Sequence, residues 1–255
     1  MRDEKSSLHA IIIVVSLVLP VTAFTACGAR AGKAKSPILL FTGTGTSPND
    51  VKATETLLAS NNLDFSPVSS FELNGMDEKD LRQYLLLIIP GGNFVDIGNS
   101  LTFATTANVR DAVHNGLNYL GVCAGAFLAG NFPAPYKGFD LTSGVKFGFY
   151  AAENRGIRKA AVAITLAGGP TLEHYWEDGP QLSGWGAVVG KYPDGTPAMV
   201  EGTFGNGWVI LTGVHAEAPE SWRHGMAFNT PATEDNSFAS TLIKAALNRT
   251  SLSHF

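Results

Sequence analysis

The segment Gly121-Val122-Cys123-Ala124-Gly125 places a thiol between two glycines, directly after the strand-like run 118–120. Small residues on both sides permit a sharp turn from a strand into a helix, which lifts one side chain off the sheet. The N–H groups at the start of such a helix can stabilise a thiolate or an oxyanion. The alternative is a small buried cysteine that packs a helix against a sheet. The segment therefore predicts either a nucleophile or a core residue at Cys123.

A histidine and a carboxylate follow a second apolar run of the sequence. Residues 208–212 are typical of a buried strand, and His215 and Glu217 come shortly after its end. In a parallel sheet, the loops that leave the carboxyl ends of the strands gather at one edge, where ligands bind. Cys123, His215 and Glu217 are therefore expected to meet there as nucleophile, proton shuttle and orienting carboxylate. His215 taken alone would suit a structural role equally well.

A third apolar run, residues 84–89, leads directly into Pro90 and two glycines. Glycine lets main-chain amides approach a ligand closely, although a Pro-Gly-Gly sequence is also a common turn. Because this segment also follows a strand, it is expected at the same edge of the sheet. The main-chain N–H groups near Gly91, Gly92 and Ala124 are expected to hold a developing oxyanion.

These three strand ends resemble the class I glutamine amidotransferase-like superfamily. Residues 121–125 are similar to its G-x-C-x-G elbow, residues 215–217 to its H-P-E and residues 90–92 to its oxyanion strand end. A more detailed resemblance, over residues 37–223, is to the domain at the N-terminus of eukaryotic biotin-protein ligases, which also occurs as free-standing bacterial proteins. The resemblance implies an amidotransferase-like fold and attack of a cysteine on an amide carbonyl.

The chain departs from this pattern at positions that bear on the substrate. Glutamine-hydrolysing members usually carry Gln four residues after the nucleophile, where this chain has Phe127, and the related intracellular protease branch has His where this chain has Ala124. The G-R-G-R-x-G-type adenylate loop of biotin ligases is absent from the sequence, so biotinylation is not expected. The expected substrate is therefore an amide or related acyl compound, a small molecule or a peptide, other than free glutamine.

Four side chains are candidates for contact with that substrate: Asn93, Phe127, Tyr175 and Trp176. The last two belong to an aromatic and polar segment, residues 173–179, which either packs into the core or forms a pocket wall. Glu173, His174 and Asp178 of this segment lack a second histidine at ligand spacing. We expect no metal and no other cofactor.

Helix and strand patterns alternate through the first half of the chain. Strands are expected at 37–41 and 65–69, and helices at 51–61, 77–83 and 105–115; the Gly- and Thr-rich residues 42–46 lack a phosphate-binding motif and are expected to form a turn. The second half is richer in strands, expected at 160–166, 187–192, 198–203 and 208–212, before a helix at 237–248. This order predicts an α/β fold, a three-layer α/β/α sandwich with a doubly wound, mostly parallel sheet of the flavodoxin-like type.

Residues 1–27 predict an export signal. Basic residues precede the apolar run 10–19, which is too short for a typical spanning helix. Residues 23–28 resemble a lipoprotein box in which Cys27 would carry the lipid, although Phe24 stands where Leu is usual; ordinary signal cleavage is the alternative. We therefore expect an exported protein of the cell envelope, either a membrane-anchored lipoprotein facing the periplasm or a soluble periplasmic protein.

Composition limits the remaining functions. With 45% hydrophobic residues in a chain of 255, a sizeable core can be buried, so residues 37–255 are expected to form one domain after a linker at 28–36. A formal net charge of -4 offers no basic surface for nucleic acid. Two functions stay open: a cysteine-dependent amidase, and an envelope binding protein that keeps the shape of the site without turnover.

Overall fold

The computed structural model describes residues 36–131, 136–142, 146–150 and 159–255. The expected signal segment, the lipidation site Cys27 and the linker up to residue 35 lie outside these ranges. Among the described residues, no helix is long and apolar enough to cross a membrane.

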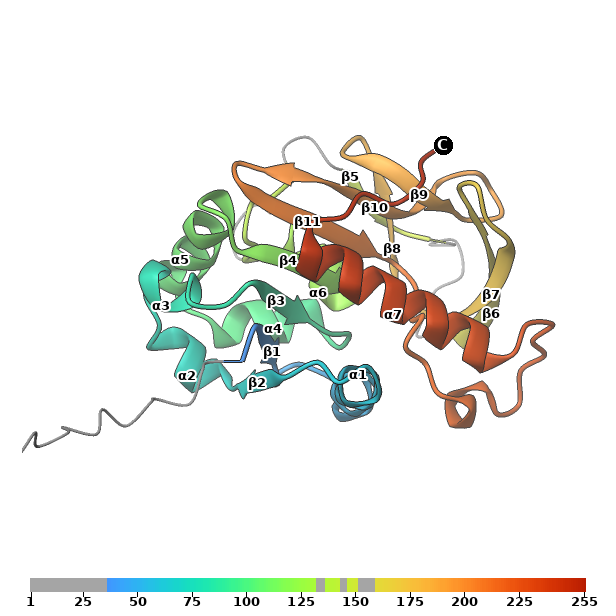
Figure 1. Cartoon of the computed structure of the whole chain (residues 1–255), viewed down its shortest axis with the longest axis horizontal. Helices are drawn as coiled ribbons and strands as arrows, with labels where there is room; N and C mark the ends of the chain where they lie inside the picture. The colour runs from blue at the N-terminus through green and yellow to red at the C-terminus, as the bar shows by residue number, and fades with distance from the viewer. Residues whose placement is uncertain (1–35, 132–135, 143–145, 151–158) are drawn as a thin grey trace, which may run out of the picture. The chain divides into compact units, whose positions relative to one another are not determined.

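One sheet dominates the described part of the chain (Figure 1). Its strand order is β2-β1-β3-β4-β11-β10-β9-β6-β7. The first five of these strands are joined by parallel pairs: β2 (Phe65–Val68), β1 (Ile38–Phe41), β3 (Leu86–Ile89), β4 (Asn118–Val122) and β11 (Gly207–Thr212). The sheet continues through antiparallel pairs with β10 (Pro197–Phe204), β9 (Ala187–Lys191), β6 (Lys159–Leu166) and β7 (Thr171–Glu177).

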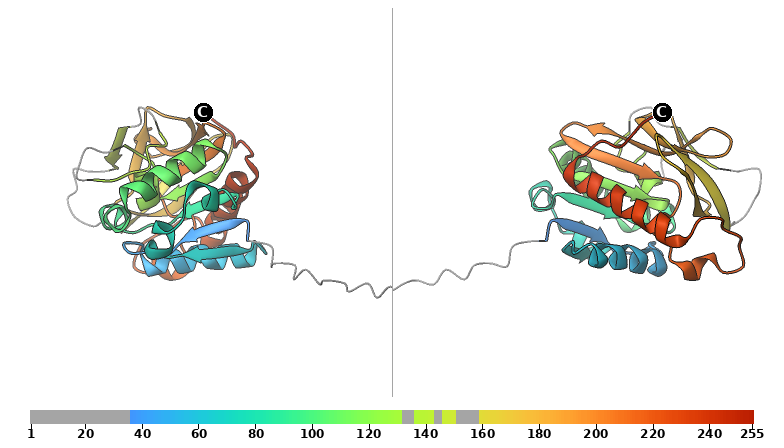
Figure 2. Two further views of the ribbon diagram at one scale, coloured as in Figure 1. Left: turned by 90° about the vertical axis from the view of Figure 1, so that its left-hand side faces the viewer. Right: turned by 45° about the vertical axis from the view of Figure 1, so that its right-hand side comes forward.

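Helices cover both faces of the parallel part, because the buried strands alternate their side chains between two apolar clusters. Ile38 and Leu40 pack in one cluster with the side chains of α1 (Pro48–Ser60) and α7 (Ala232–Asn248). Leu39 and Phe41 pack in the other cluster. Its remaining side chains come in part from the helices on that face, which are α2 (Ser70–Asn74), α3 (Glu78–Leu81), α4 (Phe94–Ser100), α5 (Phe103–His114) and α6 (Ala124–Leu128). Figure 2 shows α7 lying along the face opposite α5. The expected three-layer α/β sandwich is confirmed.

Several local expectations needed correction. Helix α1 begins at Pro48 because Ser47 caps it, accepting a hydrogen bond from the Asp50 N–H, and proline is well suited to the first helical turn. The segment that contains Tyr175 and Trp176 forms strand β7, which pairs with β6. The short elements α2 and α4 and a small second sheet, β5 (Lys146–Phe149) with β8 (Pro180–Ser183), were not expected.

The strand order places four loops at one edge of the sheet. β1, β3, β4 and β11 are mutually parallel neighbours, so the loops at their carboxyl ends converge, as they do around ligand sites in doubly wound sheets. The segments that follow these strands contain Ser47 and Asp50, the glycines after Pro90, Cys123, and His215 with Glu217. This edge holds the candidate site.

Candidate active site

Cys123 occupies the sharp turn between β4 and α6 that its sequence context predicts. Its φ of 48° and ψ of -102° are unusual for any residue other than glycine, and such backbone conformations cost roughly 1–3 kcal/mol. Its main-chain N–H donates to the oxygen of Thr212, at the end of the neighbouring β11, at 2.8 Å. Cys123 is a free thiol. A strained backbone held in place by the adjacent strand is typical of a nucleophile elbow.

The two glycines that flank the elbow are required by close backbone contacts. A Cβ at Gly121 would lie 2.5 Å from the Gly125 oxygen, and a Cβ at Gly125 would lie 2.0 Å from the Ile89 oxygen. Both contacts are with rigid main chain, so a side chain at either position would push α6 away from the sheet. The glycine spacing is therefore explained by the packing of the turn as well as by any chemistry of the thiol.

His215 is buried between two carboxylates. Its Nδ1 lies 2.9 Å from Oε1 of Glu217, in hydrogen-bond geometry, and 3.0 Å from Oδ1 of Asp50. Burial opposes protonation of the ring, but the two carboxylates outweigh it and hold the pKa of His215 well above its usual value. The imidazolium in turn lowers the pKa of Asp50, against the opposing effect of its own burial. His215 is thus oriented through Nδ1 and favours the protonated form.

Asp50 belongs to the site, although its sequence context does not predict this. It stands in the first turn of α1, far from the elbow in sequence, and nothing in a Pro-Asn-Asp helix start distinguishes a functional carboxylate from an ordinary capping residue. A Cβ at Gly91 would lie 2.1 Å from Asp50 Oδ1 and 2.6 Å from His215 Cε1. Gly91 therefore makes room for the ion pair and is not among the residues that line the pocket.

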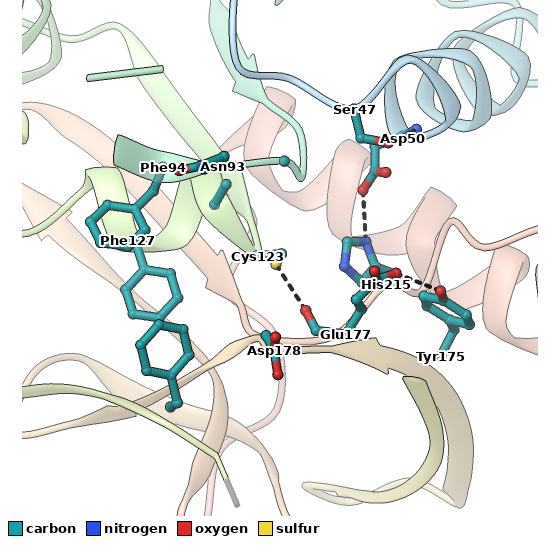
Figure 3. A pocket seen from close by; sticks show the side chains of 13 residues that line it. Ser47, Asp50, Asn93, Phe94, Cys123, Phe127, Tyr175, Glu177, Asp178 and His215 are labelled. Atoms are coloured by element: carbon teal, nitrogen blue, oxygen red, sulfur yellow. Dashed lines mark hydrogen bonds and ion pairs between the residues drawn. The ribbon is translucent and has the colours of Figure 1, made fainter. Parts of the chain in front are cut away.

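Cys123 and His215 line the same pocket, of about 410 Å³ (Figure 3). The thiol donates a hydrogen bond of 3.6 Å to the main-chain oxygen of Glu177, at the end of β7. Figure 3 shows the second ring nitrogen of His215 on the side of the imidazole that faces Cys123. Gly92 and Ala124 line the pocket as well, and Ala124 is the first residue of α6, whose N–H has no acceptor within the helix. The structure thus brings together the predicted residues Cys123, His215, Gly92 and Ala124.

An aromatic wall, formed by Phe94, Phe127 and Phe149, closes one side of this pocket. The Phe127 ring stacks on Phe94 with centroids 4.8 Å apart and lies 5.0 Å from Phe149. Phe127 therefore contributes to the pocket as well as to the packing of α6. Asn93 also lines the pocket, and its side chain caps α4 by accepting hydrogen bonds from the N–H groups of Val95 and Asp96.

The two aromatic candidates of β7 have different positions. Tyr175 lines the pocket and donates a hydrogen bond of 2.6 Å to Oε2 of Glu177. Trp176 does not reach it: the side chain is buried in the core, and its Nε1 donates to the Gly179 oxygen at 3.3 Å. Neighbouring side chains of a strand point to opposite faces, so the two could not both face the pocket. The expectation that Trp176 contacts the substrate was wrong.

The other acidic and histidine side chains of this segment are dispersed. Glu173 accepts a hydrogen bond from Asn229, and Nδ1 of His174 lies 3.2 Å from Oδ2 of Asp235, with both side chains fully buried. Asp235 also binds Arg223 at 2.6 Å, which fixes the loop after β11 against α7. This loop carries Trp222, whose ring packs edge-on against His215 with centroids 5.9 Å apart. Glu173 and His174 therefore serve the structure of the loop that supports the site.

Among the described residues, the His215 cluster is the one group in which three side chains that could ligate a metal ion lie close together. One atom each of Asp50, His215 and Glu217 lie within 4.8 Å of one another. Both carboxylates already face the same ring nitrogen at ion-pair distance, which is the arrangement expected for orientation of a histidine. We therefore interpret the cluster as a hydrogen-bonded ion pair.

The fold and the elbow are similar to those of α/β proteins of the class I glutamine amidotransferase-like type. Residues 36–159, slightly less than half of the chain, match the family model described as biotin-protein ligase, N terminal. This confirms the resemblance that the strand ends predict. No curated protein matches the sequence significantly.

Solved structures support the fold at low sequence identity. A glutamine amidotransferase superposes with a TM-score of 0.59 and 17% identity, covering 82% of this chain and 98% of that one. The structure of PurLQS from Thermotoga maritima superposes with a TM-score of 0.58 and 17% identity, covering 85% of this chain and 100% of that one. An exo-β-1,4-mannosidase from Opitutaceae bacterium strain TAV5 superposes with a TM-score of 0.52 and 14% identity, covering 84% of this chain but 36% of that one. The same fold therefore occurs in proteins with different activities, and chemistry must be argued from the site.

Proposed function

We propose that the protein is a cysteine-dependent amidase in which Cys123 is the nucleophile, His215 the acid and base, and Glu217 the orienting carboxylate. The observation that carries the proposal is the strained elbow at Cys123, which shares a pocket with a buried histidine held by a carboxylate at 2.9 Å. A thiol and an imidazole fixed in this way are the elements of covalent acyl transfer.

The reaction begins when the thiolate of Cys123 attacks the amide carbonyl and forms a carbon–sulfur bond. The main-chain N–H groups of Gly92 and Ala124 stabilise the oxyanion. His215 gives its proton to the nitrogen as the carbon–nitrogen bond breaks, which releases ammonia or an amine and leaves a thioester. Neutral His215 then takes a proton from water, whose oxygen attacks the thioester and frees the acid and the thiol.

The alternative is a binding protein of the same fold. The thiol donates to the main-chain oxygen of Glu177 and makes no hydrogen bond to His215 among those found in the described part of the chain, which is the arrangement of a resting or an unused thiol. Rotation of the Cys123 side chain would be needed before attack. Catalytic contacts are often loose in the absence of substrate, so this geometry is compatible with both functions.

Alkylation distinguishes the two functions. Because the thiolate is the reactive form and an imidazolium stabilises it, His215→Asn should slow alkylation of Cys123 by iodoacetamide at neutral pH by about tenfold or more. His114→Asn, at an exposed position of α5, is the matched control and should leave the rate unchanged. Equal rates in wild type and His215→Asn would favour the binding protein. The rate is measured by mass spectrometry of the intact protein.

We further propose that the protein is exported and anchored by a lipid on Cys27. The support is the apolar run 10–19 after Arg2 and Lys5, whose charge Asp3 and Glu4 offset, and the small residues before Cys27. Cys27→Ala should move the protein from the membrane fraction to the soluble fraction, because the lipid would be its anchor. The thermal unfolding of the domain should not change. A wild-type protein found entirely in the soluble periplasmic fraction would instead support ordinary signal cleavage.

A further inference from the structure

A second pocket adjoins the one that holds Cys123. This outer pocket has a volume of about 460 Å³, and four residues line both pockets: Ser47, Asp50, Tyr175 and Glu177. Its other described lining residues come from the start of α1, the start of β6 and the segment after β11; they are Asn49, Lys159, Ser221, Trp222, His224 and Met226. Because the two pockets share part of their walls, they lie side by side.

The outer pocket lies on the His215 side of the thiol. Tyr175 and Trp222, which line it, pack edge-on against the His215 ring, with centroids 5.7 and 5.9 Å away. The aromatic wall belongs to the Cys123 pocket, and Figure 3 shows Phe127 and His215 on opposite sides of Cys123. A substrate carbonyl at the thiol therefore has an apolar surface on one side and the outer pocket on the other.

The chemistry determines which part of an amide points each way. In the proposed reaction the carbon–sulfur bond forms at Cys123, the carbon–nitrogen bond breaks, and the proton of His215 passes to the departing nitrogen. That nitrogen must lie within hydrogen-bond reach of His215, so any group attached to it continues toward the outer pocket. The acyl group, on the other side of the carbonyl carbon, is directed toward the aromatic wall.

We propose that the preferred substrates are secondary amides, with an apolar acyl group against the aromatic wall and a polar amine part in the outer pocket, from which an amine is released. This inference rests on the proposed amidase function, since it names the substrate class for the same site. A primary amide would leave the outer pocket unused, although its volume is in the range of small-molecule sites. The amide, hydroxyl and imidazole groups of Asn49, Ser221 and His224 can form hydrogen bonds with a polar amine part.

Three amides with one acyl group test the proposal. They are N-(2-hydroxyethyl)-3-phenylpropanamide, N-propyl-3-phenylpropanamide and 3-phenylpropanamide. Each releases 3-phenylpropanoic acid, so one chromatographic measurement follows all three. We expect kcat/KM to fall in that order, by at least about tenfold between the first and the last, which corresponds to about 1.4 kcal/mol. A propyl amide hydrolysed as well as its hydroxyethyl counterpart would overturn the polar character of the amine part.

Substitutions in the outer pocket test its role. Ser221 and Asn49 are exposed residues of two different elements, and they line the outer pocket but not the Cys123 pocket. A phenyl ring at either position should fill part of the outer pocket, so Ser221→Phe and Asn49→Phe should each reduce the preference for the hydroxyethyl amide over the primary amide at least about fivefold. Ser237→Phe, at an exposed position of α7 that lines neither pocket, is the matched control and should keep the preference. An unchanged preference in both Ser221→Phe and Asn49→Phe would overturn the proposed place of the amine.

The substrate class and the amidase function can fail separately. Equal or faster hydrolysis of the primary amide would overturn the preference for secondary amides while leaving the amidase intact. If none of the three amides is hydrolysed, calorimetry with Cys123→Ala decides. Tighter binding of the hydroxyethyl amide than of the primary amide supports the two-part site without the amidase. Equal binding of the two amides, or no binding, overturns it.

Discussion

Cys123→Ala should abolish the release of ammonia from any amide that the wild-type protein hydrolyses, with a loss of at least about a thousandfold in turnover. The reason is that the proposed pathway runs through a carbon–sulfur bond, and enzymes lose most of their rate when the nucleophile is removed. A φ of 48° is about as unfavourable for alanine as for cysteine, so the variant should keep the backbone conformation of the elbow. Ammonia release is followed with an amide that the wild-type protein hydrolyses, and thermal unfolding provides the control for folding.

Free glutamine is the informative comparison in the same experiment. Wild-type turnover of glutamine should stay well below about 1 per second, an ordinary enzyme rate, because Phe127 and its stacked neighbours replace an amide side chain with aromatic surface. Glutamine hydrolysis at or above that rate, lost in Cys123→Ala, would restore a glutaminase. Full activity of Cys123→Ala on any amide would contradict the nucleophile itself.

The sequence predicts those parts of the site whose backbone geometry depends on a single short segment. The glycines around Cys123 predict the elbow because no side chain fits beside the Gly125 oxygen or the Ile89 oxygen, and the apolar runs predict the parallel strands that carry the loops to one edge. The catalytic roles of Cys123, His215 and Glu217 stay predictions, since they depend on reactivity as well as on position.

What could not be predicted depends on packing between distant segments. Asp50 reaches His215 only because α1 returns to the sheet edge and because Gly91 leaves space, and neither follows from local pattern. Trp176 was misplaced because the register of β7 decides which of two adjacent aromatic residues faces the pocket. The antiparallel half of the sheet likewise depends on pairing between strands, which strand propensity does not specify.

The second large effect is expected from the two carboxylates on His215. Glu217→Gln should lower kcat by about a hundredfold or more, because the hydrogen-bonded carboxylate at 2.9 Å orients the ring and stabilises the imidazolium. Asp50→Asn should lower kcat less, since Glu217 keeps the ring in place. Both variants should lower the pKa of His215, so the alkaline limb of the pH–rate profile should move to lower pH. If the alkaline limb of the pH–rate profile does not move in either variant, the imidazolium form of His215 is not the acid of the reaction.

Unfolding provides an independent measurement of the same ion pair. The pKa of His215 is raised on folding, so its contribution to stability is fully present below the unfolded value of 6.5 and is lost as the pH rises through the folded value. The pKa of Asp50 is lowered, so its contribution is present above 3.8 and is lost as the pH falls through the folded value. The pair therefore stabilises the fold most between these two values.

Asp50→Asn should reduce the free energy of unfolding by about 3 kcal/mol in that window, the lower end of the range for breaking a buried ion pair, because Glu217 still faces the imidazolium. The difference from wild type should shrink at higher pH, as His215 loses its proton, and at lower pH, as Asp50 gains one. Urea unfolding across the pH range measures it, and Asp111→Asn on the exposed face of α5 is the control. A difference independent of pH would mean that Asp50 acts through packing alone, and the orientation of His215 would then rest on Glu217.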